Sequence, residues 1–109
     1  MPTYAIAHVR KTNMGAEIVA YLQRIDSTIT PFGGRFKVHG GEVEEVEGNW
    51  VGRLVIIEFP TRERARSWYA SPAYQAIVRL RTDNTEGEVI FVDTVSEDHV
   101  STDLLRATP

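Results

Sequence analysis

The sequence predicts one α+β domain whose elements follow the order β-α-β-β-α-β. Three observations support this prediction: residues 3–10 alternate between two faces, residues 54–57 form a continuous apolar run, and residues 61–81 contain two helix starts in tandem. Alternation with a period of two is typical of a strand that packs one face on a core. This element order builds a four-stranded antiparallel sheet with its helices on one face, which is the ferredoxin-like arrangement.

The first half of the chain predicts a strand, a helix and a second strand. Residues 3–10 form the first strand, and Asn13 is placed as the N-cap of an amphipathic helix that Pro31 ends. Residues 35–39 alternate between apolar and polar side chains and predict a strand with one solvent-exposed face. The weaker alternation of residues 42–48 allows this strand to continue past a glycine bend.

The second half predicts a strand, a broken helix and a last strand. Residues 50–59 form the strongest strand of the chain. Thr61 can cap the helix that follows, and Ser71 with Pro72 restarts it, because serine is favoured at the N-cap and proline at the first helical position. Residues 88–95 form the last strand.

A C-terminal tail follows the predicted domain. We expect the domain to span residues 1–96 and the tail to span residues 97–109. The tail is polar and acidic apart from Leu104 and Leu105. One helical turn that docks these two leucines onto the domain is therefore expected.

Apolar side chains on both faces of the predicted sheet indicate a partner. The helices cover one face only, and an uncovered apolar face implies an interaction surface. Two such sheets packed face to face make a homodimer of the dimeric α+β barrel type, with the helices outside. The residues that suggest apolar character on the two faces are Tyr4, Ile6, Phe36, Val38, Ile56, Ile90 and Val92.

Composition excludes several classes of function. The 12 basic and 15 acidic residues give a net charge of -3, which disfavours nucleic acid as a partner. There is no cysteine, and no apolar run approaches the length of a membrane span, so disulfides and a membrane partner are not expected. No phosphate loop, dinucleotide fingerprint or zinc spacing is present, and neither a cofactor nor a metal is predicted. A cytoplasmic location is the default expectation.

Several short segments together resemble a known family. They extend over about residues 1–95 and are Gly33-Gly34-Arg35, His39-Gly40-Gly41, Glu47-Gly48, Arg53–Pro60, Ala65–Tyr69, Ser71–Gln75 and Leu80-Arg81. With these segments the chain resembles domain of unknown function family 1330. The resemblance implies a ferredoxin-like fold of the dimeric α+β barrel type and no established activity. The chain departs from the family at His39, where arginine is usual, and in its longer tail.

Glu58 is the most informative carboxylate. It follows an apolar strand segment and shares a strand face with Leu54 and Ile56. A carboxylate in such a setting either has a raised pKa, as a general acid or base needs, or is paired with a cation. Arg81 and Arg53 are the candidate partners, and a buried salt bridge is the structural alternative to a catalytic role.

Four further residues complete the predicted site. His8 and His39 can carry protons near neutral pH, and His39 stands beside a glycine pair that allows a ligand to approach the backbone. Tyr74 brings a hydroxyl that needs a partner when buried, and Arg81 can hold a carboxylate. Each also has a purely structural interpretation: an interface or edge histidine, a core tyrosine, or a cation favoured by a helix C-terminus.

These residues predict a pocket for a small anionic organic molecule, between sheet and helices or at the dimer seam. If the protein is an enzyme, cofactor-independent proton transfer or oxygenation is the expected class, with Glu58 or His39 as base and Arg81 as anchor. The alternative is a non-catalytic structural or interaction dimer. An open pocket in which Tyr74, His39 and Arg81 converge and are unpaired favours ligand binding, whereas a mutual Glu58–Arg81 pair in a closed interior favours the structural dimer.

Overall fold

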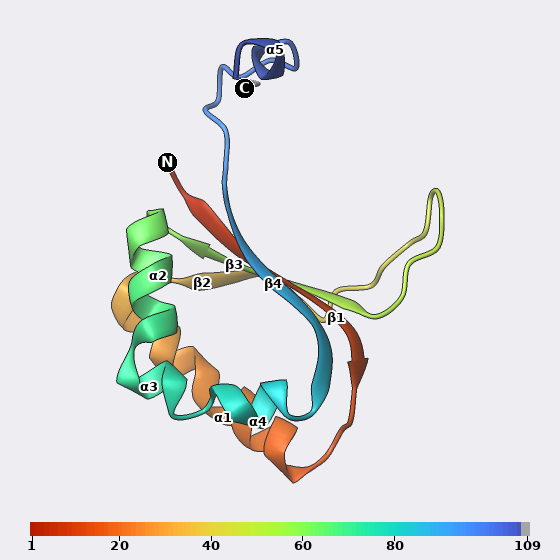
Figure 1. The fold of residues 1–109 in the computed structure, drawn as a ribbon, viewed down its shortest axis with the longest axis vertical. Coiled ribbons are helices and arrows are strands. Elements are labelled where there is room, and N and C mark those ends of the chain that lie inside the picture. The colour runs from red at the N-terminus through yellow and green to blue at the C-terminus, as the bar shows by residue number, and fades with distance from the viewer. Residues whose placement is uncertain (108–109) are drawn as a thin grey trace.

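The computed structural model describes residues 1–107, so Thr108 and Pro109 of the predicted tail lie outside the described residues. One layer is the sheet and the other is the group of helices that covers one of its faces (Figure 1). The strands are β1 (Thr3–Thr12), β2 (Arg35–His39), β3 (Arg53–Phe59) and β4 (Thr85–Asp93). The helices are α1 (Ala16–Ile29), the 3₁₀ turn η1 (Thr30–Phe32), α2 (Arg62–Ala70), α3 (Pro72–Gln75), α4 (Val78–Thr82) and α5 (Asp103–Ala107).

The sheet has the strand order β2-β3-β1-β4 with antiparallel neighbours, which confirms the ferredoxin-like fold. The register separates its two faces. Ala5 lies opposite Ile57, and both are buried on the face that the helices cover. Ile6 lies between Ile56 and Ile90 on the other face, which we call the open face. No helix within residues 1–107 is both long and apolar enough to cross a lipid bilayer.

The core lies between the covered face of the sheet and the helices. Phe59, Tyr74 and Ile77 are the largest apolar side chains that are fully buried. The Trp68 indole N–H donates to the hydroxyl of Thr28 at 3.0 Å, so the buried ring keeps its polar atom satisfied. This bond also joins α2 to α1 across the helical layer.

Ser71 divides the second helical region into α2 and α3, as the sequence predicts. Its hydroxyl accepts a hydrogen bond from the Tyr74 backbone N–H at 3.2 Å and donates to the Trp68 carbonyl at 2.6 Å. Pro72 then occupies the first turn of α3. The break turns the chain so that Tyr74 enters the core, where it is 1% exposed.

Two local expectations are wrong. Asn13 does not cap α1, which begins after Gly15 without a side-chain cap; the Asn13 backbone N–H instead donates to the Asn84 carbonyl at 2.7 Å. Residues 42–48 form a loop rather than a strand. Gly40 and Gly48 adopt φ values of 77° and 75°, and this left-handed backbone interrupts the extended conformation that pairing requires.

The tail forms a helical turn but does not dock on the domain. α5 is present, yet the Leu104 and Leu105 side chains are 63% and 78% exposed, so the expected docking is wrong. The segment after β4 instead carries α5 away from the two layers (Figure 1).

We predict that Ser71→Ala lowers the free energy of unfolding by about 1 kcal/mol, because it removes the cap of α3. Urea unfolding followed by circular dichroism measures this change. Ser67→Ala is the matched control, since Ser67 is exposed on α2 and alanine suits a helix. An equal loss in both variants would contradict a capping role for Ser71.

Candidate functional site

A cavity of about 470 Å³ lies between the covered face of the sheet and the helical layer. Its walls are mostly apolar and include Ala5 and Ala7 of β1, Val55 of β3, and Ile25 of α1. Two alanines on the central strand leave space that larger side chains would fill. The size and the apolar walls are those of a small-molecule pocket.

Two tyrosines form the buried polar centre of this cavity. The hydroxyls of Tyr21 on α1 and Tyr74 on α3 are 2.7 Å apart and share a hydrogen bond. Burial raises the pKa of Tyr21, and the neighbouring Tyr74 raises it further. Tyr21 therefore stays protonated near neutral pH and acts as a neutral hydrogen-bonding group.

Cationic side chains line the same cavity. The guanidinium carbon of Arg81 on α4 lies 6.0 Å from the centre of the Tyr21 ring. Arg53 enters from β3 and His39 from β2, where the His39 ring stacks on Phe36 with 4.2 Å between centroids. An arginine side chain is permanently charged, so at least two positive charges line the cavity.

No aspartate or glutamate is among the described residues that line the cavity. The permanently charged side chains among these described lining residues are therefore all positive, and the rest of the lining is mostly apolar. Such a site favours a ligand that carries an anionic group on an apolar body, because the anion pairs with arginine while the body is removed from water.

The structure divides the predicted site residues between the two faces of the sheet. His39, Tyr74 and Arg81 line the cavity. His8 and Glu58 have the opposite strand parity and lie on the open face. The pocket between sheet and helices thus contains three of the five predicted residues.

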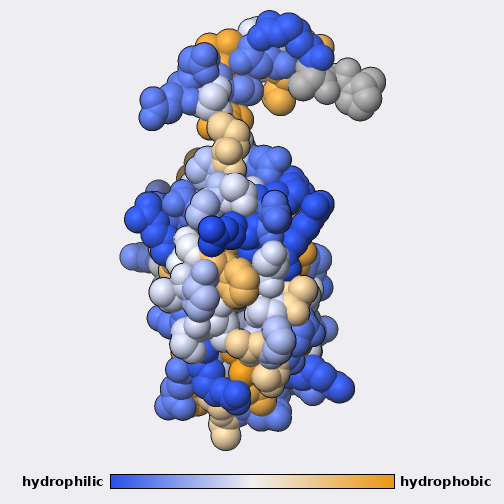
Figure 2. Space-filling model, turned by 90° about the vertical axis from the view of Figure 1, so that its left-hand side faces the viewer, coloured by the Kyte–Doolittle hydropathy of each residue, from blue (hydrophilic) through white to orange (hydrophobic). Residues whose placement is uncertain are grey.

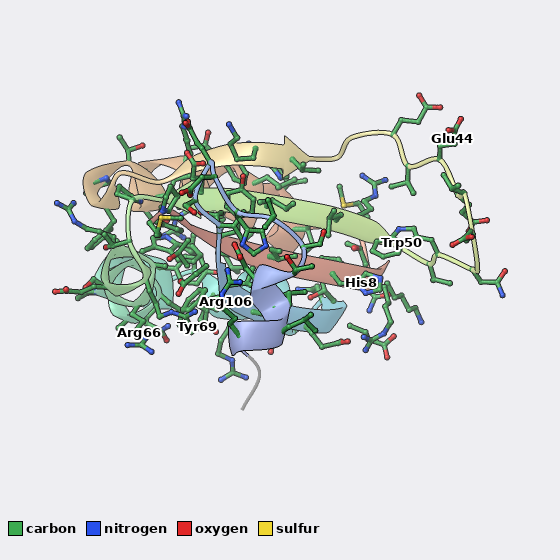
Figure 3. The ribbon with its side chains drawn as sticks, turned by 90° about the horizontal axis from the view of Figure 1, so that it is seen from above. His8, Glu44, Trp50, Arg66, Tyr69 and Arg106 are labelled. Atoms are coloured by element: carbon green, nitrogen blue, oxygen red, sulfur yellow. The ribbon has the colours of Figure 1, made fainter. Side chains whose placement is uncertain are left out.

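The contacts of His8 indicate a structural role. Its Nε2 is hydrogen-bonded to the Val51 carbonyl at 2.7 Å, and its ring stacks on Trp50 with 4.2 Å between centroids. Figure 3 shows Trp50 beside His8, at the base of the loop that carries Glu44 at its far end. These contacts attach the β2–β3 loop to the sheet.

The expected pairing of Glu58 with Arg81 or Arg53 is wrong. Its carboxylate instead accepts from Arg35, with 3.3 Å between Glu58 Oε1 and Arg35 Nε. The register places Arg35 directly opposite Glu58 on β2, whereas Arg53 points to the covered face. Of the two expected bases, only His39 lies at the cavity.

Sequence reasoning missed Tyr21 and Arg53 as cavity residues. Tyr21 occupies the apolar stripe of α1 together with Ile18 and Ile25, and this helical spacing by itself predicts only a packing role. The available signal was its hydroxyl, because a buried phenol requires a hydrogen-bonding partner. Within residues 1–107 no group of three or more histidine, aspartate or glutamate side chains is arranged to hold a metal ion.

Comparison with known proteins identifies relatives of unknown function. The family model described as "Domain of unknown function (DUF1330)" matches residues 2–95. The comparison with curated proteins finds no match. Among solved structures, the RPA0582 protein of Rhodopseudomonas palustris is 18% identical, with a TM-score of 0.69 over 90% of this chain and 84% of that one.

Two further structures share the fold at lower identity. A dimeric ferredoxin-like protein of unknown function from Jannaschia sp. is 7% identical, with a TM-score of 0.55 over 86% of this chain and 100% of that one. SnoaB, a cofactor-independent oxygenase from Streptomyces nogalater, is 13% identical, with a TM-score of 0.54 over 89% of this chain and 94% of that one. Identities this low show a common fold alone.

We predict that Tyr21→Phe and Tyr74→Phe each lower the free energy of unfolding by about 1–3 kcal/mol, because each leaves a buried hydroxyl without its partner. The double variant is expected to lose less than the sum of the two, since it removes both partners of one bond. Urea unfolding of the wild type, the two single variants and the double variant gives the double-mutant cycle that measures this interaction. Strictly additive losses would show that the two hydroxyls do not interact.

Proposed function

The chain belongs to the DUF1330 family, and from this premise we propose that it binds a small organic anion with an apolar body in the cavity between sheet and helices. The observation that carries the proposal is the charge of the lining: Arg81 and Arg53 are present, and no carboxylate is found among the described lining residues. A carboxylate or a similar anion supplies the missing counter-charge.

The cavity gives the ligand an orientation. Its anionic group lies at Arg81, whose guanidinium can donate two parallel hydrogen bonds to a carboxylate. The Tyr21–Tyr74 pair offers phenol groups beside that position. The apolar body extends along the wall that includes Ile25 and Trp68, where its burial contributes about 25 cal/mol per Å² of apolar surface.

If the bound molecule is also transformed, proton transfer or oxygenation without a cofactor is the reaction class that we favour. His39 is then the base, since it lines the cavity and an imidazole is the side chain most often used for general acid–base catalysis. Arg81 is the anchor. The fold that the chain shares with the oxygenase SnoaB supports this class by analogy only.

A second proposal concerns assembly: the open face of the sheet joins two copies into a homodimer. Its observation is the exposed apolar surface, in which the Ile90 and Val92 side chains are 53% and 40% exposed beside Ile6 and Ile56. The Jannaschia protein of the same fold is described as dimeric. This assembly is compatible with a ligand site, because the cavity lies on the other side of each sheet.

We predict that the carboxylates octanoate and phenylacetate raise the melting temperature more than their neutral amides, octanamide and phenylacetamide. A ligand at a hundred times its Kd stabilises the fold by about 2.7 kcal/mol, which is visible in a thermal-shift assay. Arg81→Gln is expected to weaken carboxylate binding roughly tenfold to a hundredfold in Kd, through loss of a charge-assisted hydrogen bond.

Arg79→Gln is the matched control for this ligand test. Arg79 lies on the same helix but points to solvent, where its side chain is 82% exposed and 3.5 Å from Asp83. Its loss is expected to leave carboxylate binding unchanged. Equal stabilisation by acids and amides, or an equal effect of both arginine variants, would count against an anion site at Arg81.

We predict that Ile90→Glu converts the dimer to a monomer, raising the dimer Kd roughly a hundredfold or more, because an unpaired carboxylate is costly to bury in an apolar interface. Analytical ultracentrifugation measures the change. Val19→Glu is the control, since Val19 is similarly exposed, at 44%, but lies on α1 away from the open face. A wild-type chain that is monomeric at high concentration would refute the dimer.

A further inference from the structure

We propose that the C-terminal arm, residues 96–107, docks on a second copy of the chain along the edge formed by its β2 strand. This inference rests on the homodimer proposed above. It concerns a segment that lies beyond residues 2–95, which the family model matches, and so it describes this chain rather than its family.

The arm stands clear of its own domain. The radius of gyration is 15.5 Å and the longest dimension is 47 Å, whereas a compact chain of this length has a radius of about 13 Å. Figure 2 shows the arm joined to the body by a narrow neck, with hydrophobic residues among its hydrophilic ones. The arm therefore has surface available for a contact outside its own fold.

The arm is locally organised and presents apolar side chains. The Asp103 carboxylate accepts from the Val100 backbone N–H at 3.2 Å and pairs with Arg106, which fixes the turn of α5. Val100 and Leu105 are nevertheless 57% and 78% exposed. A single helical turn is not stable alone in water, so this turn gains its stability from a surface that covers its apolar side chains.

Topology indicates which surface is within reach. The arm leaves the end of β4, and β4 and β2 are the two edges of the sheet. In a face-to-face dimer whose two-fold axis runs along the strands, the β4 edge of one copy lies over the β2 edge of the other. With the axis in this direction, the arm of each copy emerges beside the partner's β2.

Charge favours the same contact. Exposed Glu97 and Asp98 lie at the start of the arm, and exposed Lys37 stands on β2 two positions from Arg35, whose guanidinium already pairs with Glu58. Opposite charges at the rim of an interface orient the two copies and select the register of the contact. Apolar contact by Leu105 and charge pairing by Glu97 then act together.

The test uses a spin label that reports only contacts between copies. The chain has no cysteine, so Thr102→Cys gives a single attachment site on the arm of the full chain. Spin-labelled protein at natural isotope abundance is mixed with ¹⁵N-labelled protein that carries no spin label. Only the amide signals of the ¹⁵N-labelled copies are observed. We expect the amide signals of residues 35–39 to broaden. A label at Gln23→Cys, on the exposed side of α1, is expected to leave them sharp.

Sedimentation of the same samples separates two kinds of failure. Sharp signals at residues 35–39 in a dimeric sample overturn the arm contact and leave the dimer intact. A monomeric sample overturns the dimer and the arm contact together. Broadened signals in a dimeric sample that sharpen on adding Leu105→Glu to the labelled chain support the proposal.

Affinity measurements give a second test with a matched pair of arm variants. Leu105→Glu is expected to raise the dimer Kd roughly tenfold, and Thr102→Glu, one turn earlier, to leave it unchanged. Lys37→Glu is expected to weaken the dimer, and adding Glu97→Lys to the same chain to restore it. Failure of the charge exchange to restore affinity, together with an inert Leu105→Glu, overturns the arm contact.

Discussion

Successive side chains of a strand must point to opposite faces of the sheet, and the rest of this structure depends on that constraint in β1. β1 is flanked by β3 on one side and β4 on the other, so its alternation sets both surfaces of the molecule. Ala5 and Ala7 face the helices, and their small side chains leave the space that becomes the cavity. Ile6, between them in sequence, faces the other way and belongs to the surface proposed for assembly. One strand therefore places the proposed ligand site and the proposed dimer surface on different faces of the sheet.

The same separation explains the electrostatics of the cavity. Glu58 and Glu88 lie on the open face, where arginines from neighbouring strands pair with them. The cavity keeps Arg81 and Arg53 without an opposing carboxylate among its described lining residues. A partly buried guanidinium without a counter-ion is costly, and the phenol groups and ring of the tyrosine pair offset that cost only in part. The proposed anionic ligand would remove the rest of this cost, and this is the physical reason for proposing an anion site here.

The sequence predicted what depends on local pattern. The element order, the helix restart at Ser71 and the open apolar face follow from periodicity and capping, which act over a few residues. The site was predicted only in part. Membership of the cavity depends on strand register and on which helix face meets the sheet, and both are set by contacts between distant residues. Glu58 illustrates this: its partner Arg35 lies 23 positions away and is found only from the β2–β3 register. Tyr21 likewise looks apolar in a helical stripe until Tyr74 is placed beside it.

The two tryptophans of the chain occupy the two sides of the sheet. Trp68 is 3% exposed and lines the cavity within reach of the tyrosine pair, whereas Trp50 is 36% exposed and stacks on His8 at the open face. Indole emission depends on local polarity and on nearby quenching groups, so each tryptophan carries a separate optical signal. Occupation of the cavity changes the surroundings of Trp68, and coverage of the sheet changes those of Trp50. The protein thus contains two intrinsic fluorophores in different surroundings, and variants that keep only one of them would follow the proposed binding and association separately, without an added dye.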